Sequence, residues 1–496
     1  MMRAYFILIL IVSLMQGRIA MGEKIEKPGA KGGAVPPLRL HYEPSSGYLG
    51  DPIPFYWNGV YHVFYLNYPS PGENRALVWS HISSRDLVHW AEHPNAFAGC
   101  LTGSIIEKDG VFHAFTTEGG QVGHATSPDL DVWKKDPDFR LSVDPRWYEA
   151  SWRDPCVIWN PEDKQYWMAI CGRAKGNGSN PLTGCVALAT STDLMKWTIG
   201  PPLWSPQFST WLECPDLFPF GDKWVLLYHW RQLRVRLADD PRGPWQRPAV
   251  ESPDGWNCAA AKTMFDGKRR VLIGWIPRRT CSCGLVTGGC TLLLPREWYL
   301  LPDNTPATRP VAEVVAAFAH DATGGLGARV FQPVMSKWDI EGDGAAAAPA
   351  ADGAATALWR DPPANYYFRA EISFSPESRA TVFLRGQSAG TAYGYKTPFD
   401  TGYAVYFDPG GGMVSLRPWY EWDQRGPVNE MAYKFAKDRP TFVEIFLDGD
   451  ILEVFLDGRQ SLVGRVPEHA AGSLALSAQD GPVAFRQIKV RTIQER

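Results

Sequence analysis

The segment Trp79-Ser-His-Ile-Ser-Ser-Arg-Asp-Leu-Val-His-Trp90 decides the fold of this chain because it is repeated. Val122-Gly-His-Ala-Thr-Ser-Pro-Asp-Leu-Asp-Val-Trp133 and Val186-Ala-Leu-Ala-Thr-Ser-Thr-Asp-Leu-Met-Lys-Trp197 share its pattern Ser-x-Asp-Leu-x-x-Trp. A weaker copy over residues 235–245 keeps an Asp-Pro turn and the closing Trp. In each copy, a strand with small residues leads into an Asp turn, and the Trp begins the next strand. Such internal repetition is typical of propellers and solenoids.

A short aromatic-rich run precedes each copy. Runs of this kind, bounded by Gly, Asp or Asn, predict β-strands, and they cover residues 60–65, 111–115, 166–170 and 224–228, with a fifth at 270–275. Five copies of a strand-rich unit predict a five-bladed β-propeller of about four strands per blade, spanning residues 36–303. The alternative is a β-sandwich in which the similarity is coincidental.

The composition changes after this repeat. Residues 304–325 are rich in Pro, Ala and Gly and predict a linker with a short helical run around Val311–Phe318. Residues 326–496 alternate between strands and turns such as Asp448-Gly449, which predicts a C-terminal β-sandwich. The Ala-rich tract 342–357 is expected to be a surface loop. The predicted fold class is therefore all-β.

The N-terminus is typical of a secretory signal peptide, predicted over residues 1–22. Arg3 supplies a positive charge, a mostly apolar run extends from Ala4 to Met15, and small residues follow at Gly17 and Ala20. The run is too short to span a bilayer comfortably, although an uncleaved anchor is the alternative. We therefore expect a secreted or periplasmic protein without membrane contact after signal removal.

Charge and composition narrow the class of partner. The net charge is −3 at pH 7 and no long basic run is present, which argues against nucleic acid as the main partner. The 21 Trp, 19 Tyr and 23 Phe residues could stack on sugar rings, but aromatic residues also fill β cores. Composition alone therefore leaves sugar binding and core packing both open, and it does not indicate the oligomeric state.

The cysteines give little indication of a metal. Nine are present, so at least one cannot pair within the chain. Cys281, Cys283 and Cys290 lie close together in sequence, but a second Cys or His pair with zinc-binding spacing is missing. Buried thiols or a local disulfide are favoured over zinc at this cluster. We expect neither a metal nor an organic cofactor.

Three carboxylates stand ahead of aromatic strands in three of the repeats. Asp51 precedes Phe64, Asp154 precedes Trp167, and Glu213 precedes Trp224, each by a similar number of residues. Equivalent positions in a propeller are related by rotation about its axis. If these positions lie on the innermost strands, the three side chains meet at the centre.

Carboxylates that meet in this way are suited to glycoside hydrolysis. Like charges raise one another's pKa, so one group stays protonated near neutral pH while its partner is ionised. A protonated acid and an ionised carboxylate are the pair that cleaves a glycosidic bond. Arg153 is expected to hold its neighbour Asp154 ionised. A calcium site is the alternative, but no closely spaced run of oxygen ligands is evident.

At these residues the chain resembles glycoside hydrolase family 32, which includes invertases, levanases and inulinases. Trp152-Arg-Asp-Pro155 and Glu213-Cys-Pro-Asp216 match two motifs of that family, and further elements occur in the family's order at Leu101–Ser104, Ala261–Thr263 and Gly274–Ile276. The resemblance covers nearly the whole chain after the signal peptide. It implies a five-bladed propeller joined to a β-sandwich, in agreement with the repeat.

The resemblance also implies a role for each site residue. Asp51 would be the nucleophile of a retaining mechanism, Glu213 the acid and base, and Asp154 the stabiliser of the transition state. Arg153 would assist Asp154, and Thr102 and Trp275 would line the sugar subsite. The implied substrate is an oligo- or polysaccharide, with fructose released from β-fructosides such as levan, inulin or sucrose-like sugars.

Several residues depart from the family pattern. The first motif usually reads Asn-Asp-Pro-Asn-Gly, whereas this chain has Gly50-Asp-Pro-Ile-Pro54. Leu66 stands where a Gln is common, and Ala259 where a Tyr is common. Three hypotheses follow from these departures: a fructosidase, a related hydrolase of another furanoside or modified glycan, and a carbohydrate-binding protein without catalysis. The linkage cleaved and endo or exo attack are not predicted.

Overall fold

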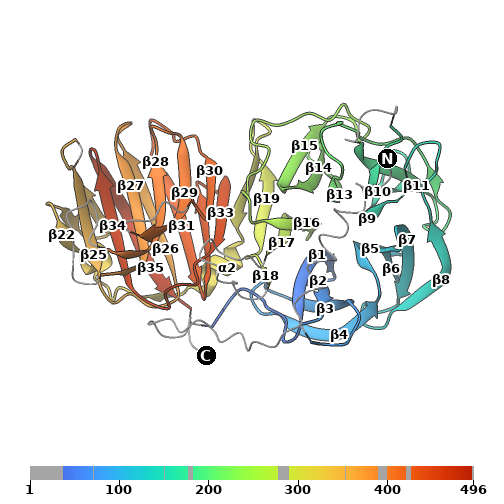
Figure 1. The fold of residues 1–496 in the computed structure, drawn as a ribbon, viewed down its shortest axis with the longest axis horizontal. Helices are drawn as coiled ribbons and strands as arrows, with labels where there is room; N and C mark the ends of the chain where they lie inside the picture. The colour runs from blue at the N-terminus through green and yellow to red at the C-terminus, as the bar shows by residue number, and fades with distance from the viewer. Residues whose placement is uncertain are drawn as a thin grey trace, which may run out of the picture.

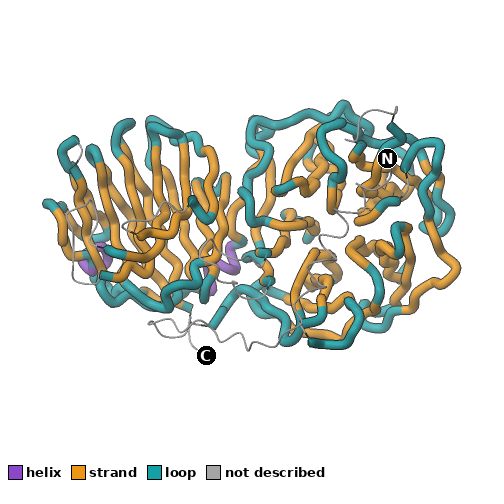
Figure 2. The backbone as a smooth tube through the Cα atoms, in the orientation of Figure 1, coloured by secondary structure: helices purple, strands orange, loops and turns teal. Residues whose placement is uncertain are grey.

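The computed structural model describes residues 37–493 except 71, 150, 177–182, 278–289, 352, 389–398 and 421–425. Two bodies built of β-strands lie side by side, with the N-terminal body on the right of Figure 1 and the C-terminal body on the left. Strands dominate both, and the little helix visible is confined to short segments (Figure 2). The predicted signal peptide, 1–22, lies outside the described residues. Within the described residues, no helix is both long and apolar enough to cross a membrane.

The N-terminal body is a five-bladed β-propeller, which confirms the prediction from the repeat. The first two blades contain four antiparallel strands each: β1 (Tyr48–Trp57), β2 (Val60–Tyr68), β3 (Val78–Ser84), β4 (Ala91–Ala98), then β5 (Leu101–Lys108), β6 (Val111–Glu118), β7 (Gln121–Ser127), β8 (Lys134–Leu141). The third and fourth contain β9 (Arg153–Asn160), β10 (Gln165–Arg173), β11 (Gly184–Ser191), β12 (Thr198–Ile199), then β13 (Glu213–Phe220), β14 (Lys223–Trp230), β15 (Gln232–Ala238). The fifth contains β16 (Ala259–Phe265), β17 (Arg270–Ile276), β18 (Thr291–Leu292), β19 (Arg296–Leu300), β20 (Pro306–Pro310).

The repeated Ser-x-Asp-Leu-x-x-Trp pattern forms the turn that leaves the third strand of a blade. In the second blade, the Asp129 carboxylate accepts hydrogen bonds from the backbone N–H groups of Asp131 (3.0 Å) and Val132 (2.8 Å). Leu130 adopts a positive φ of 70°, and its carbonyl accepts a 2.8 Å hydrogen bond from the Trp133 indole. An Asp side chain that replaces backbone partners in a turn explains why this residue recurs.

Aromatic side chains of the second strands fill the spaces between adjacent blades. Phe64 packs with Ile105 and Phe112 between the first and second blades. Trp167 packs with Leu217 and Trp224 between the third and fourth. Burial of apolar area at each boundary stabilises the ring of blades and explains the demand for aromatic residues in these strands.

The linker is shorter than the predicted 304–325. β20 still pairs with β19 inside the fifth blade, and β21 (His320–Asp321) already pairs with the last strand of the sandwich. Only the segment between them connects the bodies, and it contains the short helix α2 (Ala312–Ala317), near the predicted helical run. The propeller therefore extends past residue 303, and the sandwich begins before residue 326.

The C-terminal body is the predicted β-sandwich of two antiparallel sheets. One sheet contains β23 (Asp339–Glu341), β24 (Gly344–Ala347), β35 (Val483–Thr492), β26 (Tyr366–Phe374), β31 (Thr441–Asp448), β32 (Ile451–Leu456) and β33 (Gln460–Arg465), with β21 at its side. The other contains β22 (Gln332–Met335), β25 (Ala354–Trp359), β34 (Ser473–Gln479), β27 (Arg379–Gln387), β28 (Thr401–Asp408), β29 (Met413–Tyr420) and β30 (Asn429–Ala432). A short 3₁₀ helix, η1 (Gly327–Val330), precedes β22.

The prediction that residues 342–357 form a surface loop is wrong. This tract supplies β24 to one sheet and β25 to the other. Alternate methyl groups, those of Ala345, Ala347, Ala355 and Ala357, point into the buried core between the sheets. Because side chains alternate across a strand, an Ala-rich tract can direct every second methyl group into a core.

A network of buried charges joins the two bodies. The Asp448 carboxylate at the end of β31 accepts hydrogen bonds from the backbone of Arg39, Leu40 and His41, the segment that leads into the first blade. The His41 ring contacts Asp448 (2.8 Å) and Glu453 of β32 (3.1 Å). Arg296 of the fifth blade pairs with Glu453 and, at 2.8 Å, with Asp254. We call these five ionisable side chains, His41, Asp254, Arg296, Asp448 and Glu453, the junction network.

The cysteines that the structure describes in detail do not form disulfides with one another. Six are buried free thiols: Cys100, Cys156, Cys171, Cys185, Cys214 and Cys258. Cys281 and Cys283 lie outside the described residues, so the cluster singled out in the sequence stays a prediction.

Candidate active site at the centre of the propeller

The first strand of every blade lies at the centre of the propeller (Figure 1). Each of these strands pairs irregularly near its start. The pairing with the second strand shifts after Gly50 in β1, Leu101 in β5, Arg153 in β9, Glu213 in β13 and Ala259 in β16. A bulge bends a strand and re-aims its side chains. Five bulges at one level therefore turn the chain at the rim of the central channel.

The bulges show that the three carboxylates are not all equivalent. Asp51 and Asp154 each directly follow the last paired residue, Gly50 or Arg153. Glu213 is itself the last paired residue, opposite His229, and Cys214 takes the position of Asp154. The predicted register of three equivalent carboxylates is thus wrong by one residue at Glu213. Consecutive residues point in different directions, so Glu213 is aimed differently from the other two.

The structure nevertheless brings the three carboxylates to one place. Arg153 donates a hydrogen bond to Glu213, and its Nε lies 3.7 Å from Asp154 Oδ2. Asp154 also accepts a 3.0 Å hydrogen bond from the Cys214 backbone N–H. The negative charge of Asp51 raises the pKa of Asp154, and that of Glu213 raises the pKa of Asp51. Three acidic groups from the first, third and fourth blades share one electrostatic environment.

Burial raises the pKa of two of these carboxyls. The Asp154 side chain is almost fully buried, and this desolvation, strengthened by Asp51 and opposed by Arg153, raises its pKa to about 6. Burial and Glu213 likewise raise the pKa of Asp51, against the attraction of Lys262. Arg153 lowers the pKa of Asp154, as predicted, but the cost of burial exceeds the attraction of the guanidinium, so Asp154 ionises at a higher pH than an exposed Asp.

Glu213 has the opposite tendency. Its side chain is 44 % exposed, and the interactions with His229 and Arg153 outweigh the effect of burial and lower its pKa. His229 Nδ1 lies 3.7 Å from Glu213 Oε2, and the guanidinium of Arg153 rests 4.6 Å from the centre of the Trp211 ring. An exposed carboxylate beside two buried carboxyls can exchange protons with a bound molecule.

Lys262 is a residue of the site that sequence reasoning missed. It is almost fully buried on β16, and its Nζ donates 2.8 Å hydrogen bonds to Thr102 Oγ1 and to the carbonyl of Gly103. Lys262 also lines a cavity of about 320 Å³ between the five innermost strands, beyond the bulges. The only signal in the sequence was its place in the matching element Ala261–Thr263. As a buried cation, it stabilises the ionised form of Asp51.

Thr102 and Trp275 lie where the blades meet the channel, but in different environments. Thr102 is fully buried and its hydroxyl accepts the hydrogen bond from Lys262, so it supports the floor of the site and does not present its side chain to solvent. Trp275 is partly exposed on β17, opposite Ala259 of the fifth bulge. Its buried indole N–H has no hydrogen-bond partner among the described residues.

The altered first motif has a structural counterpart in Tyr68. A Cβ atom placed on Gly50 would lie 2.8 Å from Tyr68 Cε2, closer than real Cβ contacts allow. Burial and the charge of Asp51 raise the pKa of the Tyr68 hydroxyl, which places this ring beside the carboxylate. Tyr68 is 39 % exposed. An aromatic face therefore occupies the space that an Asn side chain at position 50 would require.

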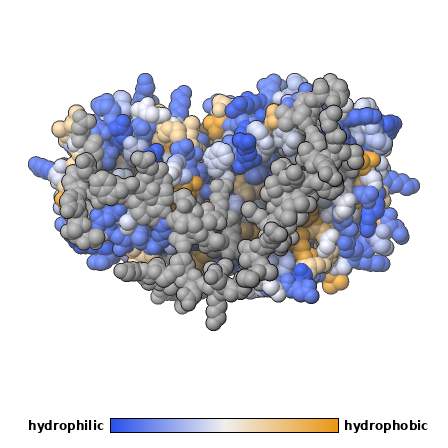
Figure 3. Space-filling model, viewed as in Figure 1, coloured by the Kyte–Doolittle hydropathy of each residue, from blue (hydrophilic) through white to orange (hydrophobic). Residues whose placement is uncertain are grey.

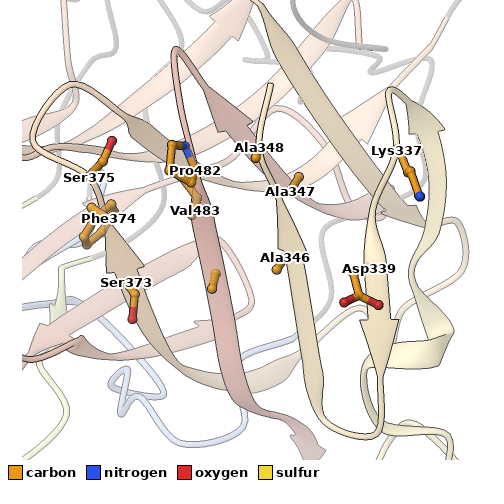
Figure 4. Close-up of a pocket in the computed structure, with 11 residues that line it drawn as sticks. Lys337, Asp339, Ala346, Ala347, Ala348, Ser373, Phe374, Ser375, Pro482 and Val483 are labelled. Atoms are coloured by element: carbon orange, nitrogen blue, oxygen red, sulfur yellow. The ribbon is translucent and has the colours of Figure 1, made fainter. Parts of the chain in front are cut away.

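A second cavity, of about 580 Å³, lies on the sandwich (Figure 4). Lys337 and Asp339 stand on one side of it and Ser373, Phe374 and Ser375 on the other, with Ala and Val side chains between them. Among the described residues that line it, Asp339 is the only one with a carboxylate. The described lining therefore lacks a pair of acidic groups, and the centre of the propeller is the candidate for hydrolysis.

Comparison with known families agrees with this division. Residues 41–281 match the family described as Glycosyl hydrolases family 32 N-terminal domain, and residues 329–491 match a 3-keto-alpha-glucoside-1,2-lyase-like domain. The first match contains all three carboxylates. The second covers most of the sandwich.

Individual relatives point the same way. A fructan 1-exohydrolase of Aegilops speltoides is 31% identical over 338 residues, which cover 55% of this chain and 54% of the relative. The insoluble isoenzyme 4 of β-fructofuranosidase from Oryza sativa subsp. japonica is 28% identical over 334 residues, with 55% of each chain covered. The chain thus spans about half the length of the curated relatives it matches.

Solved structures share the fold of both bodies. The exo-inulinase of Aspergillus awamori superposes with a TM-score of 0.69 at 19% identity, covering 92% of this chain and 98% of that one. The family 32 β-fructofuranosidase of Bombyx mori superposes with a TM-score of 0.66 at 18% identity, covering 92% and 94%. These solved structures show the fold alone, whereas the match of residues 41–281 assigns the propeller, with its three central carboxylates, to glycoside hydrolase family 32.

Proposed function

We propose that the protein is a secreted, retaining glycoside hydrolase that releases fructose from β-fructosides or fructans. The observation that carries this proposal is the meeting of Asp51, Asp154 and Glu213 at the centre of a family 32 propeller, with Arg153 between the last two. Relatives named as fructan exohydrolases and β-fructofuranosidases support a fructose-containing substrate. The signal-like sequence of residues 1–22 supports export.

The proposed reaction has two steps. Asp51 attacks the anomeric carbon as the bond to the leaving oxygen breaks, and Glu213 gives its proton to that oxygen. Glu213 then removes a proton from water, which attacks the anomeric carbon and frees Asp51. Asp154, whose buried carboxyl faces the same place, would hold sugar hydroxyls near the reacting carbon. Retention requires the carboxyl groups of Asp51 and Glu213 to be about 5–5.5 Å apart.

The protonation of the pair sets the working pH. The reaction starts from ionised Asp51 and protonated Glu213, whereas in the free protein burial favours a proton on Asp51, and Arg153 with His229 favours ionised Glu213. Because the two groups interact, they share a proton as a pair. A bound sugar that separates Glu213 from solvent makes the ionised form of Glu213 less favourable and so shifts the shared proton toward it. We therefore expect activity to require that the pair keeps one proton.

Product analysis tests the proposal. The full chain would be incubated with sucrose, inulin and levan, and the products separated by chromatography, with Asp51→Asn as the matched inactive control. We expect free fructose from at least one of the three, and none with the variant. The absence of fructose from all three, with a folded protein, would reject fructosidase activity.

The contact between Gly50 and Tyr68 favours a second candidate, a hydrolase of another furanoside or of a modified glycan. A panel of aryl furanosides and plant or algal polysaccharides would reveal it. Tyr68→Ala opens the space above Gly50, so we expect it to lower the ratio of kcat/KM on the preferred substrate to that on sucrose by about tenfold. An unchanged ratio would show that Tyr68 does not select the sugar, and activity confined to fructans would remove this candidate.

A further inference from the structure

The hairpin between β14 and β15 has an Arg residue at its tip in a strained backbone conformation. Glu213 of β13 pairs with His229 of β14. The next residue, Trp230, pairs with Gln232 of β15, so Arg231 alone forms the turn. Arg231 has a positive φ of 64°, a conformation that favours Gly and costs free energy for a bulky side chain. Strain of this kind clusters at functional sites, and this tip lies at the same end of the fourth blade as Glu213.

Aromatic rings fix the guanidinium groups at this tip. The guanidinium carbons of Arg231 and Arg234 lie 5.5 Å and 4.7 Å from the centre of the Trp230 ring. Phe208 packs against the same ring, with 4.9 Å between the ring centres. Contact with an aromatic face attracts a guanidinium group and restricts its movement. A group that is held in place before a ligand arrives loses less entropy on binding.

Arg234 and two further Arg side chains share a single buried carboxylate. Arg234 Nη1 and Arg247 Nε lie 2.7 Å and 2.9 Å from Glu251 Oε2. Arg236 pairs with the other oxygen, which the Tyr228 hydroxyl contacts at 3.3 Å. An ionised carboxylate offers about four acceptor sites, so that of Glu251 is fully used and positive charge remains in excess. We call these three residues and the tip residue the arginine cluster: Arg231, Arg234, Arg236 and Arg247.

The missing counter-charge, not exposure, distinguishes the arginine cluster. Hydrophilic residues cover much of the face shown in Figure 3, so exposed charge is common on this protein. Arg242, at the opposite end of the fourth blade, is also exposed and lies 4.6 Å from the centre of the Trp167 ring, but it pairs with Asp163 at 2.6 Å. Arg231 is exposed and pairs with no acidic side chain among the residues that the structure describes. Arg242 is therefore a matched control for Arg231.

The arginine cluster lies on the side of the site from which the leaving group would extend. Trp230 directly follows His229, whose Nδ1 is 3.7 Å from Glu213 Oε2. In the proposed reaction Glu213 gives its proton to the leaving oxygen, so the sugar beyond that oxygen starts beside Glu213. A glycan chain that leaves the site over the fourth blade would pass the tip that carries Arg231.

We propose that the arginine cluster binds an anionic group, a sulfate or a carboxylate, on the leaving part of the glycan. The guanidinium group presents its N–H donors in a planar fork that matches such oxyanions. The preferred substrate is then an acidic glycan and not a neutral sugar. This inference rests on the proposed function, because that function places the leaving group beside Glu213, and it specifies the modification of the glycan considered there as the second candidate.

The first test compares a neutral fructan with its acidic derivative. The full chain would be assayed on inulin and on lightly carboxymethylated inulin, which share a backbone and differ in charge. We expect kcat/KM to be about tenfold higher on the carboxymethylated form at low salt, and this preference to decline as salt is added. Arg231→Gln and Arg247→Gln should each lower the ratio of the two kcat/KM values, whereas Arg242→Gln should not. An equal ratio for the wild type and all three variants would overturn the inference while leaving fructosidase activity intact.

A binding measurement separates this inference from the proposed function, because it needs neither fructose nor catalysis. On immobilised dextran sulfate we expect the wild type to elute at a higher salt concentration than Arg231→Gln and Arg247→Gln. Arg242→Gln removes the same charge and should elute with the wild type. Circular dichroism would confirm that these exposed substitutions leave the fold intact. Elution of all three variants together, or no retention of the wild type, would overturn the anion site. Retention that depends on Arg231, without cleavage of any fructan, would support the anion site and reject the fructosidase.

Discussion

The propeller centre and the junction network both bury ionisable side chains, yet they treat them in opposite ways. In the junction network the Asp448 and Glu453 carboxylates have lowered pKa values and His41 a raised one, because opposite charges and hydrogen bonds outweigh the cost of burial. At the centre of the propeller, burial raises the pKa of Asp51 and Asp154. Charges paired with opposite charges stabilise the folded state, whereas buried carboxyls with raised pKa values are typical of reactive sites. The predictions below test this contrast.

The largest effect is expected at the centre, on activity alone. Glu213→Gln keeps the shape of the side chain but cannot donate or accept the catalytic proton, so kcat should fall by about 10²–10⁴-fold. Asp51→Asn should reduce it at least as much. Steady-state kinetics on the best fructoside would measure both. A melting temperature that falls together with activity would assign these residues to stability and would break the contrast.

In the junction network a similar free energy should appear as stability. Arg296→Met removes the partner of two fully buried carboxylates, Asp254 and Glu453, and stranding buried charge in this way costs about 3–5 kcal/mol. Chemical denaturation would show it as a lower midpoint. The double variant Arg296→Met/Glu453→Met is the control, since it removes charge from both sides and should recover part of the loss. Equal midpoints for wild type and Arg296→Met would contradict the prediction.

The junction network should also make stability depend on pH. The pKa of His41 is raised from its ordinary 6.5 to about 9, so its contribution is complete below about pH 6.5 and disappears as pH rises through about 9. The shift corresponds to about 3 kcal/mol. Denaturation midpoints between pH 6 and 10 should therefore fall more steeply for the wild type than for His41→Gln. Parallel curves would show that His41 does not carry the dependence.

The smallest expected effect is that of Asp154 on the stability of the protein. The folded-state pKa of Asp154, about 6, lies above its ordinary 3.8, so stability declines as pH rises from about 4 through 6, and ionised Asp154 is a net cost at neutral pH. Asp154→Asn removes this cost and should raise the stability at pH 7. The gain should be less than about 3 kcal/mol, because the variant also loses the attraction between Asp154 and Arg153. Activity should fall at the same time. A variant that is less stable at pH 7 would contradict this prediction.

Much of the fold was predictable because it repeats. Asp129, Leu130 and Trp133 each have a role within the turn itself. The pattern therefore recurs in the sequence, and its copies indicate the number of blades. The Ala-rich tract was not predictable in the same way. Composition does not distinguish an exposed loop from a strand that buries alternate methyl groups, as Ala345 and Ala347 do.

The candidate site was predictable in its members but not in its register. Distance to the next aromatic residue was a poor measure, because the aromatic residues are not equivalent in the two blades. Phe64 lies opposite His81, whereas Trp167 lies opposite Thr190, which is two positions away in the repeat. The bulges then displaced Glu213 by one residue. The sequence marked Lys262 only as part of the element Ala261–Thr263, because its importance comes from burial beside Asp51.

The Asp448 carboxylate of the sandwich accepts hydrogen bonds from the backbone of residues 39–41, and these bonds limit where the chain can be cut into separate domains. Those residues lead directly into β1, the strand that carries Asp51. A propeller cut away at the connecting segment would release the entry to its own first strand. A foreign C-terminal body joined to this propeller would need a carboxylate at the same place to accept hydrogen bonds from these three backbone N–H groups. The two bodies are separate in fold, but the first depends on the second to fix its N-terminal segment.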